Sequence, residues 1–140
     1  MCTSFLMANN LFKDNFKIPE CELSKMEILQ KSVIKILTMA LEVGNVYIVT
    51  NAAHGWVEHS INAFFPKVRP LLKSVRVISA RTLYETKFPN DMMQWKTLTY
   101  LDLQKYYQSN KLTNLICIGD SPMDMYAAKV LAGTFSDCYL

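Results

Sequence analysis

The chain has 140 residues, which is enough for one domain with a buried core. With 51% hydrophobic and 19% charged residues, its composition is that of a globular protein and excludes an intrinsically disordered chain. The net charge is only +3 and the basic residues are scattered, so we expect no nucleic-acid partner.

Residues 1–23 form a poorly defined N-terminal segment. The opening residues MCTSFLMANNLF are apolar but lack a basic region and a small-residue cleavage site. They also fall short of the roughly 20 apolar residues that cross a bilayer, so we expect no membrane partner. The four cysteines have no CxxC spacing, which favours a reducing compartment. We therefore expect a cytoplasmic location.

The first clear element is a helix over residues 25–43. Ser24 and Glu27 have the spacing of a capping box, and Gly44 is suited to the position after a helix end. The β-branched run 45–50 predicts a buried strand. The segment 56–65 follows as a helix that Pro66 ends.

Strands and helices continue to alternate along the rest of the chain. We predict strands over 74–79 and 115–118, a helix from about 89 to 109, and a last helix over 123–131 closed by Gly133. This order predicts βαβ units and one α/β domain over residues 1–140, built on a parallel sheet. Ligand sites in such sheets lie beyond the carboxyl ends of the strands, where Thr50, Ser79 and Asp120 stand.

Thr50 and Asn51 end the first predicted strand. A hydroxyl and a backbone N–H at this point can donate hydrogen bonds to an anionic oxygen. Taken alone, the pair is more typical of the start of a turn.

Asp120 and Asp124 lie where the third predicted strand meets the last helix. Mg²⁺ takes one or two carboxylates together with water and phosphate oxygens, so the pair is a candidate metal site. The alternative is a helix cap that begins at Ser121, since acidic residues stabilise helix starts. A cap accounts for one carboxylate but not for the second one a turn later, and Gly119 leaves room for a close approach.

Lys96 lies early in the helix that follows Pro89. A lysine near the site would neutralise a phosphate or fix a carboxylate in place. By itself, the residue is more typical of a solvated helix surface.

Taken together, VYIVTN, Lys96 and IGDSPMD resemble the second, third and fourth motifs of the haloacid dehalogenase (HAD) superfamily of phosphatases, and of a small capless branch in particular. The resemblance covers residues 24–133 and implies a three-layer α/β/α, Rossmann-like parallel sheet. It also implies Mg²⁺-dependent hydrolysis of phosphate esters. Thr50, Asn51 and Lys96 would then be catalytic residues, and Asp120 and Asp124 would be metal ligands.

The first motif of that family, a D-x-D whose first aspartate is the nucleophile, is absent from the sequence. The one candidate, Asp14, has no apolar strand before it and no second aspartate two residues later. We therefore expect a partial domain, incomplete at both ends, in which strands 46–50 and 115–119 lack the strand between them. Without the nucleophile of the first motif, we expect little or no phosphatase activity and weak or absent Mg²⁺ binding. An uncapped site would suit a phosphorylated substrate that is a macromolecule.

Two alternatives are open. In the first alternative, the chain is a non-catalytic binding or regulatory remnant of the same fold, with a partner surface formed by Trp56, Trp95 and the Tyr106-Tyr107 pair. In the second, it is a GDS-type serine esterase with Ser121 as nucleophile. The esterase alternative is weakened because no histidine follows Ser121. Both histidines, His54 and His59, lie far upstream, and His54 is the one close to the predicted anion site.

Overall fold

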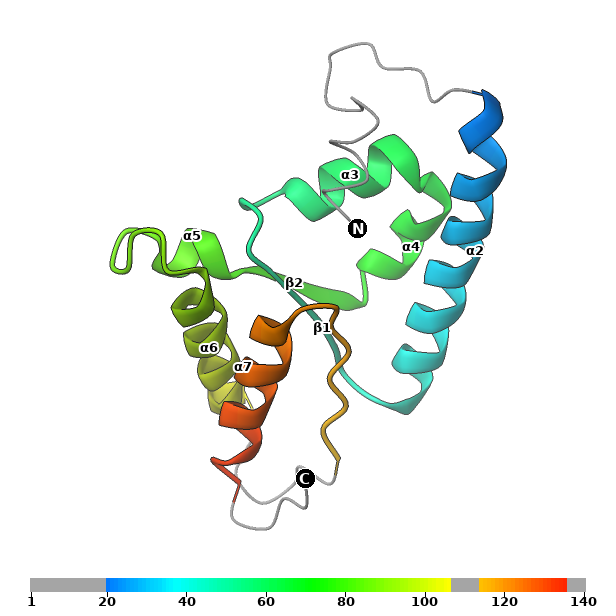
Figure 1. Cartoon of the computed structure of the whole chain (residues 1–140). Helices are drawn as coiled ribbons and strands as arrows, with labels where there is room; N and C mark the ends of the chain where they lie inside the picture. The colour runs from blue at the N-terminus through cyan, green and yellow to red at the C-terminus, as the bar shows by residue number, and fades with distance from the viewer. Residues whose placement is uncertain (1–19, 107–113, 136–140) are drawn as a thin grey trace. The chain divides into compact units, whose positions relative to one another are not determined.

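The computed structural model describes residues 20–106 and 114–135 (Figure 1). These residues fall into two compact units. The first unit comprises residues 20–46 and 55–76, and the second comprises 47–54, 77–106 and 114–135. The N-terminal segment 1–19 and Tyr107 lie outside the described residues. The helix expected from about 89 to 109 is shorter: it runs from Met92 to Leu103, and a 3₁₀ turn follows it.

The first unit is helical. It contains α2 (Glu20–Val43), α3 (Trp56–Phe64), the 3₁₀ turn η1 (Pro66–Val68) and α4 (Arg69–Leu72). Its core is formed by buried side chains from α2, α3 and the turn that follows: Met26, Ile61, Phe65 and Val68. The loop at η1 is tied to α2, because the Gln30 side chain accepts a hydrogen bond from the Lys67 backbone N–H at 3.0 Å.

α2 confirms the predicted helix but begins earlier than the sequence pattern indicates. Ser24 lies within the helix, so the capping-box interpretation of Ser24 and Glu27 is wrong. The far end is as expected, with Gly44 following Val43 and its N–H bonded to the Ala40 carbonyl. α2 is the longest helix described, and no helix in the described ranges has the length and apolar character needed to cross a membrane.

The second unit is built around a small two-stranded parallel sheet. Its strands are β1 (Val46–Thr50) and β2 (Val75–Ser79), and the division between the units runs through both. The remaining elements are α5 (Ala80–Tyr84), α6 (Met92–Leu103), the 3₁₀ turn η2 (Gln104–Tyr106) and α7 (Pro122–Ala132). α6 packs against both α5 and α7 (Figure 1).

Small side chains on α7 allow α6 to approach closely. Ala127 and Ala128 are buried on this helix together with Leu131, opposite the buried face of α6. On α6 itself Trp95 is only 3% exposed, and its Nε1–H donates to the Phe88 carbonyl at 2.6 Å. Trp95 is therefore a core residue, as is usual for aromatic side chains at helical spacing, and it does not belong to the partner surface of the remnant alternative.

The predicted strand over 115–118 is also wrong: residues 114–119 run between η2 and α7 without being assigned to a strand. Leu115 and Cys117 are half-buried, whereas Ile116 and Ile118 are 69% and 82% exposed. The sequence alternation that predicts a strand is thus present, but a strand also needs a hydrogen-bonded neighbour, which the described residues do not supply here. The chain is α/β with a small parallel sheet.

Candidate functional site

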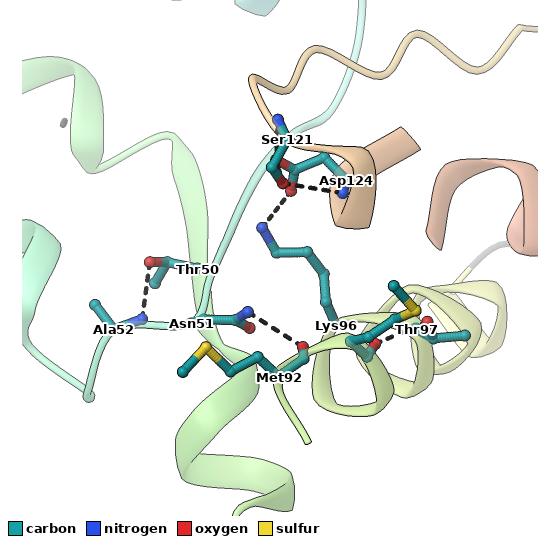
Figure 2. Close-up of polar contacts among 9 residues, drawn as sticks. Thr50, Asn51, Ala52, Met92, Lys96, Thr97, Ser121 and Asp124 are labelled. Carbon is teal, nitrogen blue, oxygen red and sulfur yellow. Dashed lines mark hydrogen bonds and ion pairs between the residues drawn. The ribbon is translucent and has the colours of Figure 1, made fainter. Parts of the chain in front are cut away.

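The loop after β1 is held at both of its candidate residues (Figure 2). Thr50 Oγ1 accepts a hydrogen bond from the Ala52 N–H at 3.1 Å, and the Asn51 amide donates to the Met92 carbonyl at 3.2 Å. Asn51 Oδ1 is buried and has no hydrogen-bond partner among the described residues. The pair therefore forms a turn, as the simpler interpretation held, and this turn is fastened to the first turn of α6.

A second anchor joins this loop to the end of β2. Ser79 Oγ donates to the Ala52 carbonyl at 2.6 Å and also accepts from the Thr82 N–H at 3.0 Å as the N-cap of α5. Thr82 Oγ1 accepts in turn from the His54 N–H at 3.1 Å. Thr82 was not identified from the sequence, although its position three residues after a strand-ending serine is a detectable capping signal.

Lys96 and Asp124 form a buried ion pair between α6 and α7. Lys96 Nζ donates directly to Asp124 Oδ1, and the two side chains are only 11% and 12% exposed (Figure 2). Lys96 lies one helical turn after Met92, so the same end of α6 binds both Asn51 and Asp124. Of the roles considered for Lys96, fixing a carboxylate is the one observed, and a solvated surface lysine is excluded.

Asp124 is also part of the N-terminal cap of α7. Ser121 Oγ accepts from the Asp124 N–H at 3.3 Å, while Asp124 Oδ2 accepts from the Ser121 N–H at 3.2 Å and from its hydroxyl at 2.7 Å. The prediction that Ser121 begins a helix cap is confirmed. Both carboxylate oxygens of Asp124 are thus engaged, one by Lys96 and one by Ser121.

Gly119 makes this arrangement sterically possible. A Cβ atom placed on residue 119 would lie 2.3 Å from Asp124 Cβ and 2.7 Å from its Cγ. Contacts that short do not occur between carbon atoms that are not bonded. The close approach expected at Gly119 from the sequence is therefore present, and Asp124 is the group that occupies the space.

The surroundings of Asp124 set its charge. Burial favours the neutral acid, but hydrogen bonds from Lys96 and Ser121 outweigh it and hold the pKa of Asp124 below its ordinary value of 3.8. Tyr100 lies on α6, and burial, with smaller contributions from Cys117 and Asp124, raises its pKa to about 12. Burial also raises the pKa of the Cys117 thiol, which behaves as a small hydrophobic group at neutral pH.

The lowered pKa of Asp124 predicts a pH dependence of stability. Because the folded pKa lies below the ordinary value, the stabilisation is complete above pH 3.8 and is lost as the pH falls from there through the folded value. The difference in free energy of unfolding between the wild type and Asp124→Asn should therefore shrink below that pH. Urea unfolding at a series of pH values from 7 to 3 measures this difference. A difference in free energy of unfolding that widens as the pH falls would contradict the lowered pKa of Asp124.

Asp120 differs from Asp124 in its surroundings. Its side chain is exposed, and it stands at the end of the extended segment, directly before the Ser121 cap. No group of three or more histidine, cysteine or acidic side chains in residues 20–106 and 114–135 is placed to hold a metal ion. The donor set fits Mg²⁺ only as a weak, water-rich site with Asp120 as its carboxylate, because Asp124 is already paired.

The histidines add little to the site. His54 is exposed in the loop after β1, close in sequence to Asn51, and its contact with a substrate stays a prediction. His59 is exposed on α3, where its ring lies 5.8 Å from that of Trp56. Among the contacts of the described residues, Ser121 is bonded to Asp124 and not to a histidine. A serine nucleophile would need such a base.

No protein-family model matches the sequence, and comparisons with curated proteins and with solved structures found no similar protein. What the site does is therefore inferred from its own geometry together with the motifs in the sequence.

Proposed function

We propose that the chain is a partial HAD-like phosphohydrolase domain that binds a phosphoryl group at the carboxyl ends of its strands and does not hydrolyse it. One observation carries the proposal: Lys96 and Asp124, which stand at the third and fourth motif positions, form a direct and buried ion pair. If Lys96 were only a surface lysine and Asp124 only a helix cap, neither role would require contact between the two side chains.

The residues around the pair have the chemistry to hold an anion. The ammonium group of Lys96 has three N–H donors, of which the Asp124 bond uses one. Thr50 accepts from Ala52, which leaves its hydroxyl hydrogen to donate to a phosphate oxygen. The Asn51–Met92 hydrogen bond fastens the Thr50 turn to the helix that carries Lys96. Together they supply N–H donors and a hydroxyl donor for a phosphate.

The metal would be held by Asp120. When bound, Mg²⁺ would neutralise phosphate charge, with Asp120 as a carboxylate ligand and water molecules completing the shell. Asp124 would act as a positioning residue that orients Lys96 and the start of α7. The expected affinity is low, because a single carboxylate is available.

Covalent turnover needs a nucleophilic carboxylate and an acid/base beside it, and the sequence has no D-x-D to supply them. Asp124 cannot replace them, since both of its oxygens are engaged. The substrate class we propose is a phosphorylated macromolecule, because the elements between Asn51 and Lys96 are short and leave no cap domain over the site.

Binding and turnover can be tested separately. With an aryl phosphate and Mg²⁺, we expect hydrolysis no faster than in buffer. Titration with inorganic phosphate, followed by ³¹P NMR line width, should show Mg²⁺-dependent binding that Asp120→Asn weakens at least about threefold, the loss of one charge-assisted contact. Glu58→Gln, an exposed carboxylate on α3, is the matched control and should change nothing.

Three outcomes discriminate the candidates. Clear turnover that Asp120→Asn abolishes would overturn the inactive assignment and make the chain an enzyme. Phosphate binding that is indifferent to Mg²⁺ would favour the non-catalytic remnant of the same fold, which has no need of a metal. If phosphate does not bind at all, the proposal is wrong.

A further inference from the structure

α2 has two apolar faces. One face packs into the core of the first unit through Met26, Val33, Ile34 and Leu37. The opposite face carries a row of side chains spaced three or four residues apart, all of them large and apolar except for one serine. We name this row the α2 stripe; its members are Ile28, Ser32, Ile36, Met39 and Val43. Its four apolar members are between 55% and 79% exposed, and Leu29 at its edge is 44% exposed.

Such a stripe is unusual for a surface helix. Single exposed apolar side chains are normal, but a continuous row over four turns of one helix is typical of an interaction surface. The one polar member does not interrupt it, because the Ser32 hydroxyl donates to the Ile28 carbonyl at 3.1 Å within the helix. The stripe therefore presents no unpaired polar group to a partner.

The charges beside the stripe indicate what that partner is. Lys31 and Lys35 lie along one flank in the middle of the helix, and Glu42 lies on the same flank near the C-terminal end; all three are exposed. When two copies of α2 pair in parallel, this flank of one copy faces the opposite flank of the other, where Leu29 and Ala40 lie, so the lysines would meet no acidic partner there. When they pair antiparallel about a point near Ile36, the same flanks face each other and Lys31 of one copy lies opposite Glu42 of the other, while Lys35 lies close to the axis.

We propose that the α2 stripe is the contact surface of a homodimer in which two copies of α2 pair antiparallel, with the two-fold axis close to Ile36. The surface is self-complementary, as a two-fold interface requires. Apolar side chains of each stripe cover those of the other, and two symmetry-related Lys31–Glu42 pairs fix the direction.

The apolar part of the proposal is tested by the mass of the full chain in solution. Sedimentation equilibrium should show a monomer–dimer equilibrium for the wild type and a monomer for Ile36→Asp, with the dimer dissociation constant raised at least about a hundredfold by a charge at the centre of an apolar contact. Leu83→Asp is the matched control, because Leu83 is a 52% exposed leucine on α5, an element of the second unit. It should leave the dimer unchanged.

The direction of pairing is tested by charge reversal. Glu42→Lys gives the flank three positive charges and should weaken the dimer about tenfold, since two exposed ion pairs become repulsive. Lys31→Glu with Lys35→Glu gives three negative charges and should do the same. An equimolar mixture of the two variants should recover the dimer as a mixed pair.

Glu42→Lys does not weaken the helix itself, since a lysine near the C-terminus interacts favourably with the helix dipole. A wild type that stays monomeric at every concentration would overturn the proposal. So would an Ile36→Asp variant that loses unfolding stability without any change in mass, because another part of the same chain would then cover the stripe. A dimer that Glu42→Lys leaves unchanged would exclude the antiparallel arrangement.

Discussion

Replacing Lys96 with methionine should lower the free energy of unfolding by about 3–5 kcal/mol, which is the effect of leaving one partner of a buried ion pair uncompensated. The Asp124 carboxylate is 12% exposed, so water solvates it poorly once the lysine is gone. Urea denaturation monitored by tryptophan fluorescence measures the change, because Trp95 is buried on the same helix.

The control for this prediction is an exposed pair on a neighbouring helix. Arg81 and Glu85 are bonded at 2.8 Å but are 47% and 43% exposed, so Arg81→Met should lower the free energy of unfolding far less than Lys96→Met does. The double variant Lys96→Met/Asp124→Asn should recover most of the loss, since it removes the buried charge together with its partner. A Lys96→Met loss as small as that of Arg81→Met would contradict the buried pair.

The periodic elements could be predicted from the sequence because local patterns determine them. Apolar spacing gave α3, β1, β2 and α7 within a residue or two, and the Ser121 cap follows from a serine three residues before an aspartate. The start of α2 was missed because Ser24 and Glu27 satisfy a capping pattern inside a helix as readily as at its beginning.

What depends on tertiary neighbours could not be predicted in this way. Residues 115–118 have the alternation of a strand, yet a ladder needs a second chain segment that no local pattern identifies. Lys96 was placed on the right helix, but whether it faced solvent or Asp124 depended on how α6 packs against α7. The roles of Thr50, Asn51, Lys96, Asp120 and Asp124 in phosphate chemistry stay predictions.

Gly119→Ala should destabilise the second unit by about 3 kcal/mol or more, although it adds a single methyl group. Overpacking alone costs about 1–3 kcal/mol, and here the added Cβ would also displace the residue that holds Lys96. The backbone of Gly119 does not lie in the left-handed region, so the loss would come from the clash and not from a strained φ. Gly44→Ala is the matched control: nothing lies within 4 Å of its added Cβ, and it should stabilise by about 0.4–1 kcal/mol or change nothing.

A double-mutant cycle separates the two parts of the Gly119 effect. In the Asp124→Asn background the ion pair is already lost, so Gly119→Ala should cost only its steric part. That part should persist, because the shortest approach is to Asp124 Cβ at 2.3 Å, an atom that asparagine keeps. A coupling energy above about 0.5 kcal/mol between the two substitutions would show that Gly119 stabilises the unit partly by letting Asp124 reach Lys96. Strict additivity, measured by urea unfolding of all four proteins, would show instead that the glycine and the ion pair act independently.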